Sequence, residues 1–299
     1  MSAARGRLAP TPTGSLHLGH AATFLFAAQL AKGCGGTLVF RLEDLDPQRC
    51  RPEFARAALE DLAWLGLTWD AGPDIGGPHS PYQQSERRSH YQQAWQRLWR
   101  TGHIYPSTAS RKEWQALAQA PHAEEPLFPV ELRQATPDFD LNISPGSTHW
   151  RFRVPDGEVV AFVDQLYGPQ AFVAGQDFGD FLIWSHDDIP AYELAVVVDD
   201  HAMGITQVVR GRDLLLSTAR QQLLAKALGA TLPQTCHAPL LMDDNGQRLA
   251  KRHHSLSLAA MRESGLTPSE VRHLALQKQE EAAQREGLQN DYRLLSLAG

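Results

Sequence analysis

Apolar and polar residues follow one another in the N-terminal part of the chain in a pattern that predicts alternating strands and helices. Residues 7–10 form a short apolar entry, residues 18–31 have the length and composition of a helix, and residues 38–42 are an apolar run that ends in charges. Such a run is typical of a buried strand. Apolar residues recur at helical spacing over 54–65 and 91–99. This order predicts a parallel sheet with right-handed crossovers.

The middle of the chain has a different pattern. It is rich in Pro and Gly and contains short strand-like runs at 150–154 and 159–163, which predicts an insertion with a loop-rich front. Strand and helix then alternate again, with a helix near 192–198, a strand at 207–210 and a helix over 218–228. The expected division is 1–105 and 187–245 for two halves of one α/β domain, 106–186 for the insertion, and 246–299 for a basic loop and a polar helical segment.

Composition and charge narrow the classes of protein to which the chain could belong. The chain of 299 residues is 42% hydrophobic and 21% charged, enough for a substantial core, and it has no apolar stretch long enough to cross a bilayer. Residues 1–7 run straight into motif-bearing sequence, which leaves no room for a signal peptide and predicts a cytoplasmic protein. Three widely spaced cysteines indicate reduced thiols. With a net charge of −6, any contact with nucleic acid must be a local basic patch.

The first candidate site is a histidine pair near the N-terminus. His17 and His20 flank Gly19 where a predicted strand gives way to a predicted helix. The start of a helix has unpaired N–H groups and a partial positive charge, so it suits a phosphate group. Glycine would let a flat ring approach the backbone closely, and histidines can donate hydrogen bonds to a phosphoryl group. Taken alone, the pair is equally compatible with half of a metal site or with two surface histidines.

Three stretches together resemble the glutamyl type of class I aminoacyl-tRNA synthetases. The run Ala-Pro-Thr-Pro-Thr-Gly at 9–14, followed by His-Leu-Gly-His at 17–20, is similar to the family's first signature. Residues 40–49 and 191–211 are similar to two further family motifs, and the resemblance spans residues 5–255. It implies an α/β fold with a Rossmann-like parallel sheet, an inserted α+β subdomain and a short helical C-terminal segment.

The resemblance also implies a pocket for free glutamate. Planar guanidinium groups can bind the carboxylates, an anion can bind the ammonium group, and a hydroxyl can shape the wall. The glutamate-binding residues carried over from the family are Arg7, Ala9, Thr11, Glu43, Tyr192 and Arg210. Without the family, Glu43, Asp44 and Asp46 would be a charged strand end and a helix cap. The pair Asp199 and Asp200 could be a metal site, although a structural role at a helix end is the favoured interpretation.

A basic stretch at 246–252 resembles the family's "KMSKS" loop. Arg248 and Ala250 depart from the family pattern, whereas Lys251 keeps it. A basic loop of this kind can close over a triphosphate and stabilise charge on the leaving pyrophosphate. Alone, it would be an ordinary solvated turn. The resemblance implies that His17, His20 and Lys251 are catalytic and that His17, Gly19, His20, Arg248 and Lys251 bind ATP, with Mg²⁺ on its phosphates.

The implied reaction is activation of L-glutamate by ATP to glutamyl-adenylate. After Lys251 only residues 252–299 remain, which leaves no room for the anticodon-binding region of full-length relatives. Short family members instead transfer glutamate to queuosine in the anticodon of tRNA(Asp), and Val196 stands where full-length members tend to have Asn. Two other hypotheses stay open. One is an enzyme that charges a tRNA 3′ end or another acceptor, and the other is a non-catalytic tRNA-binding paralogue.

A structural zinc ion is not expected. Relatives of the short type often begin a zinc site with Cys-x-Cys, but Ser107 and Ala109 stand at those positions. No cysteine lies between Cys50 and Cys236, and the histidines of the insertion are scattered. Zinc requires a closed set of thiolate or imidazole ligands. The sequence therefore predicts no metal site.

Overall fold

The structure is a computed structural model that describes residues 3–33, 35–109, 127–242, 257–288 and 291–292. Its centre contains two parallel strand pairs. β1 (Arg5–Leu8) pairs with β2 (Thr37–Phe40), and β8 (Gln207–Gly211) pairs with β9 (Gln234–Ala238). The two pairs lie next to one another. At this junction the backbone N–H of Thr206, just before β8, donates to the Arg5 carbonyl of β1 at 2.9 Å. The strands expected at 38–42 and 207–210 are thus present, the first of them ending earlier, at Phe40.

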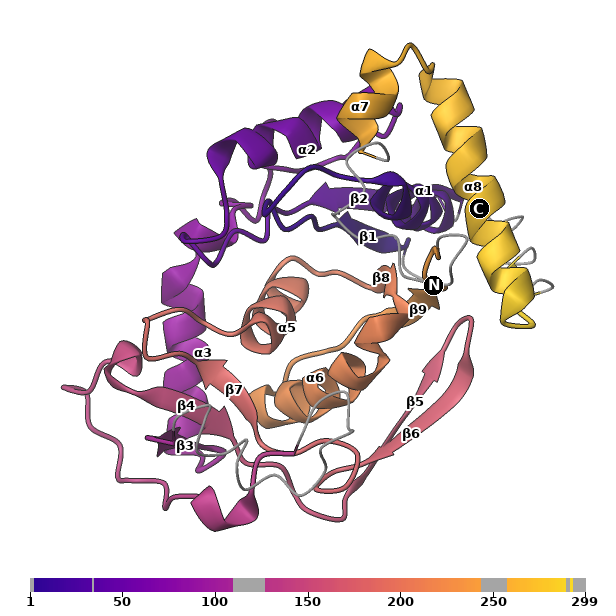
Figure 1. Ribbon diagram of the computed structural model, residues 1–299. Coiled ribbons are helices and arrows are strands. Elements are labelled where there is room, and N and C mark those ends of the chain that lie inside the picture. The colour runs from indigo at the N-terminus through magenta and orange to yellow at the C-terminus, as the bar shows by residue number, and fades with distance from the viewer. Residues whose placement is uncertain (1–2, 34, 110–126, 243–256, 289–290, 293–299) are drawn as a thin grey trace.

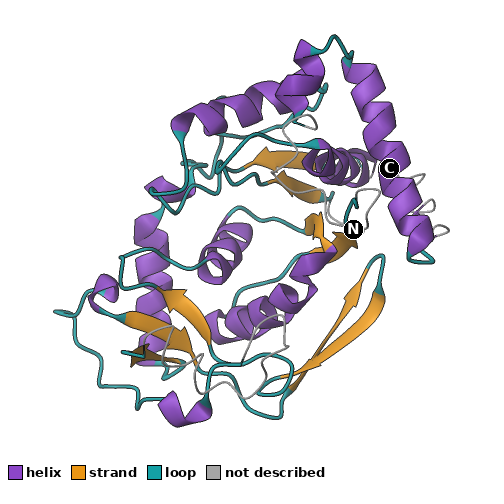
Figure 2. Cartoon of the chain, viewed as in Figure 1, coloured by secondary structure: helices purple, strands orange, loops and turns teal. Residues whose placement is uncertain are grey.

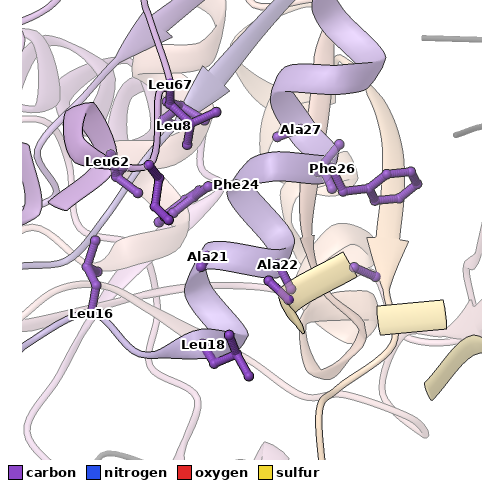
Figure 3. Packing of buried hydrophobic residues seen from close by; sticks show 14 of the residues in the cluster. Leu8, Leu16, Leu18, Ala21, Ala22, Phe24, Phe26, Ala27, Leu62 and Leu67 are labelled. Atoms are coloured by element: carbon purple, nitrogen blue, oxygen red, sulfur yellow. The ribbon is translucent and has the colours of Figure 1, made fainter. Parts of the chain in front are cut away.

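The helix α1 (Leu18–Gly33) lies between this central region and α8 (Pro268–Arg285) (Figure 1). A helix that is apolar nearly all round must be covered on several sides, and α1 packs against β1, β8 and α8. The side chains that form this part of the core are shown in Figure 3, where they include Leu8, Leu16, Leu18, Ala21, Ala22, Phe24, Phe26, Ala27, Leu62 and Leu67. The core therefore fixes the start of α1 against the ends of the central strands.

Further helices follow in the first half of the chain. α2 (Pro52–Trp64) and α3 (Arg88–Arg100) match the two amphipathic stretches. α3 leads into a second, antiparallel sheet of β3 (Ile104–Ser107), β4 (His149–Phe152) and β7 (Phe181–Trp184). Large aromatic side chains from α3, β4 and β7 form its core, namely Trp95, Trp99, Trp150 and Trp184.

The insertion is not separate from the central strands. β5 (Val159–Asp164) and β6 (Gly168–Val173) form an antiparallel hairpin that extends along one side of the molecule (Figure 2). The end of β5 pairs with β9 of the later α/β half, with Asp164 opposite Thr235. The expected boundary at 105/106 falls inside β3. Residues from the insertion therefore reach the centre of the fold.

The second half supplies α5 (Tyr192–Ala202) and α6 (Leu215–Leu228), and α6 begins earlier than the expected residue 218. Between residues 257 and 288 the polar segment forms two helices, as expected, with α7 (Leu258–Glu263) preceding α8. Short 3-10 turns complete the described elements: η1 (Gln84–Glu86), η2 (Val130–Leu132), η3 (Pro145–Ser147) and η4 (Arg212–Leu214). Within the described residues, no helix combines the length and apolarity needed to span a membrane.

Candidate functional site

A cavity of about 540 Å³ lies where the carboxyl ends of β1, β8 and β9 meet the start of α1. This edge of a parallel sheet is where α/β folds bind ligands. Nine residues singled out from the sequence line the cavity together: Arg7, Ala9, Thr11, His17, Gly19, His20, Glu43, Tyr192 and Arg210. Their roles stay predictions, but the fold brings these separate motifs to one place.

One wall of the cavity is a buried chain of alternating charges. Arg7 Nε contacts Asp200 Oδ1 at 3.1 Å, and Arg41 Nη1 contacts the same oxygen at 2.6 Å. Arg41 Nη2 then donates to Glu43 Oε1 at 3.0 Å. Burial raises the pKa of Asp200, but the charges of Arg41 and Arg7 outweigh burial and hold that pKa below its usual value. Arg41 thus connects Glu43 to Asp200, and Asp200 in turn contacts Arg7.

Arg41 was missed by the sequence analysis, although it lies inside the motif at 40–49. Its side chain is 0% exposed, and it bridges the carboxylates of Asp200 and Glu43. Burial opposes its charge, but the nearby carboxylates, Asp200 foremost, raise the pKa of the guanidinium above its ordinary value. The only sequence feature that could have indicated a role for Arg41 is its position directly after β2, two residues before Glu43.

The second cation of the cavity, Arg210, is fixed by contacts on three nitrogens. Its Nε donates to His237 Nε2 at 3.1 Å, and its Nη2 donates to the Thr218 hydroxyl at 2.6 Å. Its Nη1 lies 3.5 Å from the hydroxyl of Tyr192. Burial raises the pKa of Tyr192, so this residue presents a neutral hydroxyl to the cavity.

The histidine pair lies at the start of α1, where the two rings are tilted by 31° with a centroid distance of 3.8 Å. His17 Nδ1 accepts the Gly19 N–H at 3.1 Å, and His20 Nδ1 accepts the His17 N–H at 3.2 Å. Because both Nδ1 atoms accept, a neutral ring must carry its proton on Nε2. A Cβ on Gly19 would lie 3.0 Å from the His17 ring, so a larger residue there would press on the histidine pair.

The other acidic residues of the motifs have structural partners. Asp199 accepts hydrogen bonds from Arg87 at 2.6 Å and from Tyr91 at 2.8 Å, and it is fully buried. Asp44 accepts from Ser85, and Asp46 accepts the N–H groups of a tight turn. The arginine partners of Asp199 and Asp200 favour the structural interpretation of this pair over a metal site.

Several further cavity residues were not singled out from the sequence, although some of them lie inside the motifs at 9–14, 40–49 and 191–211. Most belong to segments that follow a strand, and their approach depends on the folded sheet: Pro10, Thr13, Leu16, Thr23, Phe24, Arg49, Val209, Gly211, Asp213, Leu214, Pro239, Leu240 and Leu241. The apolar residues at 239–241 directly follow β9 and give the cavity an apolar side. Arg49 is exposed at the cavity and adds a third guanidinium.

Two predicted residues, Arg248 and Lys251, lie outside the described residues. The described residues on either side of 243–256 are close to the cavity, since Leu241 lines it and Ser257 forms a backbone bridge with His17. Among the described residues, no three of His, Cys, Asp or Glu are grouped to hold a metal ion. Because 110–126 is not described, the absence of zinc stays a prediction.

Comparison with known proteins gives consistent matches. Residues 3–290 match the model of the family described as tRNA synthetases class I (E and Q), catalytic domain. The chain is 49% identical over 271 residues to a Glutamyl-Q tRNA(Asp) synthetase of Symbiobacterium thermophilum, covering 89% of this chain and 83% of that protein. It is 39% identical over 271 residues to Glutamate--tRNA ligase 2 of Nitrosococcus oceani, covering 89% of this chain and 57% of that protein.

Among solved structures, the chain resembles a glutamate tRNA ligase from Elizabethkingia meningosepticum in complex with its amino acid. The TM-score is 0.70 at 28% identity, and the match covers 89% of this chain and 54% of that one. The chain thus spans about half the length of this structure and of the glutamate ligase relative.

Proposed function

The chain belongs to the class I tRNA synthetase family of the glutamate and glutamine type, and we propose that it activates glutamate with ATP and transfers it to queuosine in tRNA(Asp). The observation that carries the proposal is the cavity. Two buried guanidinium groups, Arg7 and Arg210, and one buried carboxylate, Glu43, line the same space as the histidine pair of α1. Such a charge set complements an amino acid with two carboxylates.

Glutamate would bind with its charges distributed over this set. A guanidinium binds a carboxylate through two parallel hydrogen bonds, and the low-dielectric wall strengthens each contact. Arg7 uses Nε for Asp200, and its terminal nitrogens form no hydrogen bond with another described residue. Glu43 would receive the ammonium group, and Tyr192 would donate its hydroxyl. Glutamine and aspartate should bind worse, because one lacks the second negative charge and the other is a methylene shorter.

ATP would bind with its phosphates at the start of α1. Because both Nδ1 atoms accept backbone N–H groups, the Nε2–H groups of His17 and His20 are the side-chain donors that would suit phosphate oxygens. The apolar side of the cavity at 239–241 suits a base. Mg²⁺ would accompany the triphosphate and neutralise part of its charge. Lys251, predicted from the sequence, would stabilise the departing pyrophosphate.

The proposed chemistry has two steps. An oxygen of the glutamate α-carboxylate attacks the α-phosphorus of ATP, the bond from that phosphorus to the bridging oxygen breaks, and pyrophosphate leaves. A hydroxyl of the acceptor then attacks the activated carbonyl, AMP leaves, and a glutamyl ester remains on the acceptor. The protein contributes position and charge stabilisation rather than a covalent intermediate.

The choice of queuosine as acceptor rests on the pattern of relatives. Over alignments of equal length, identity is 49% to the Glutamyl-Q tRNA(Asp) synthetase and 39% to the Glutamate--tRNA ligase 2. The first also matches over 83% of its own length, against 57% for the second. Both comparisons favour transfer to queuosine over charging of a 3′ end.

The activation step is tested by exchange of labelled pyrophosphate into ATP. We expect exchange to depend on glutamate and to be at least about tenfold weaker with glutamine, because a binding site for a charged group rejects an uncharged analogue. Glu43→Gln should raise the glutamate KM strongly, whereas Lys226→Ala, at an exposed ion pair with Glu158, should not change it. Exchange that is independent of glutamate would contradict the activation step, and the absence of exchange would contradict it and favour a non-catalytic binding protein.

A further inference from the structure

Behind Arg210, on the side away from the cavity, lies a buried pair that the proposed reaction does not use. His237 Nδ1 lies 2.6 Å from Asp164 Oδ2, and both side chains are 0% exposed. Asp164 is the last residue of β5 in the insertion, and His237 is in β9. The pair is thus formed where the insertion meets the central strands.

Arg210 at one end and Asp164 at the other fix the directions of the hydrogen bonds to the His237 ring. An arginine Nε always carries a proton, so Arg210 can only donate to His237 Nε2. Nε2 must therefore be an acceptor, and the proton of the neutral ring must be on Nδ1, where it donates to Asp164. The Thr218 hydroxyl, which accepts from Arg210, lies 3.1 Å from the same Nε2.

The charge states agree with these directions. Burial lowers the pKa of His237 and favours the neutral ring. Burial alone would raise the pKa of Asp164, but the hydrogen bonds from His237 and from backbone N–H groups outweigh it and keep that pKa low. Asp164 also accepts the N–H groups of Leu166 and Tyr167 at 3.1 and 3.0 Å, so its carboxylate is fixed in position.

We infer that Asp164 and His237 are positioning residues for substrate recognition. Asp164 holds His237 in the tautomer with a proton on Nδ1. His237 Nε2 then accepts from Arg210 Nε and fixes the guanidinium, so that the Nη1 edge of Arg210, beside Tyr192, is available to a carboxylate of the substrate. The inference rests on the proposed function for the identity of that substrate. It links the insertion, through a single carboxylate, to the amino-acid pocket.

Substitution of Asp164→Asn tests the tautomer. If the new amide keeps its oxygen on the backbone N–H groups, its NH₂ group faces His237 Nδ1. Nδ1 must then accept, and the ring proton moves to Nε2. The Nε2–H of His237 and the Nε–H of Arg210 are then two donors that face each other. The glutamate KM should rise by about tenfold or more, the range for losing a hydrogen bond to a charged group. The ATP KM should stay within about twofold.

Two substitutions of His237 separate its two contacts. In His237→Gln the amide oxygen can replace Nε2 and accept from Arg210, whereas in His237→Asn the shorter amide can only replace Nδ1 and contact Asp164. The Gln variant should retain more glutamate affinity than the Asn variant. Since glutamine has no tautomer to set, adding Asp164→Asn to His237→Gln should change the glutamate KM by no more than about twofold. Lys226→Ala serves as the surface control.

The result that would overturn the inference is an unchanged glutamate KM in Asp164→Asn, or an equal rise in the wild-type and His237→Gln backgrounds. An equal rise, together with a parallel loss of thermal stability and of ATP affinity, would mark Asp164 as a residue that only supports folding.

A spectroscopic measurement is independent of activity. In the intact protein with ¹⁵N-labelled histidine, the ring signals absent from His237→Gln belong to His237, and we expect a neutral ring protonated on Nδ1. A proton on Nε2, or a doubly protonated ring, would overturn the inference even if exchange is normal. If the wild-type protein shows no glutamate-dependent exchange, the proposed function fails, but the spectrum still decides the tautomer.

Discussion

The buried cation Arg41 gives the sharpest test of how the cavity wall is held together. In Arg41→Met the side chain keeps a similar length but loses both ion pairs, at 2.6 Å to Asp200 and 3.0 Å to Glu43. The partner side chains are only 4% and 7% exposed, so water cannot replace the lost contacts. Removing one partner of a buried charge group costs about 3–5 kcal/mol, and this is the loss of unfolding free energy that we expect.

Two further variants calibrate this value. Arg41→Lys keeps the charge, but a single ammonium group cannot reproduce the planar fork toward two carboxylates, so we expect an intermediate loss of about 1–3 kcal/mol. Lys226→Ala removes an ion pair whose side chains are 72% and 37% exposed, and it should cost less than about 1 kcal/mol.

Urea unfolding at neutral pH, followed by circular dichroism and extrapolated linearly, measures all three losses. The m-values should stay equal, so that the shifts in midpoint report stability. If Arg41→Met lost no more stability than Lys226→Ala, the buried charge chain would contribute little, and the view that it holds the cavity wall together would be wrong.

Other predictions concern pH, ATP and the basic loop. Burial raises the pKa of Asp61, which lies 3.8 Å from Arg262, to about 6. The folded state therefore binds this proton more tightly than the unfolded state does, so the contribution of Asp61 to stability falls as pH rises from about 4 through 6. Urea midpoints at several pH values should show a flatter dependence in Asp61→Asn. Gly19→Ala would place a Cβ 3.0 Å from the His17 ring and should raise the ATP KM in the exchange assay. Lys251→Ala should slow exchange and leave glutamate affinity nearly unchanged, and an unaltered rate would exclude its proposed role.

Much of the fold could be predicted from local patterns in the sequence. The family resemblance drawn from the motifs is confirmed by the match over residues 3–290. The helices α2 and α3 appear where apolar spacing predicts them, because each buries an apolar stripe, and α1 appears within the apolar segment expected to be a helix.

Contacts between distant segments could not be predicted. Asp164 meets His237 only because β5 pairs with β9 at a single register position, Asp164 opposite Thr235. Arg41 meets Asp200 because the motif after β2 lies beside the last turn of α5. Spacing along the chain has no information about such pairs, so the sequence indicated nine residues that line the cavity but not the residues that hold them in place.

The central claim, transfer of glutamate to queuosine, is tested most directly with labelled glutamate, ATP and two matched tRNA(Asp) preparations, one containing queuosine and one containing unmodified guanosine. We expect label only on the queuosine form, and we expect that label to survive removal of the 3′ end. Label lost with the 3′ end, or label on neither tRNA while glutamate-dependent pyrophosphate exchange is intact, would contradict the claim.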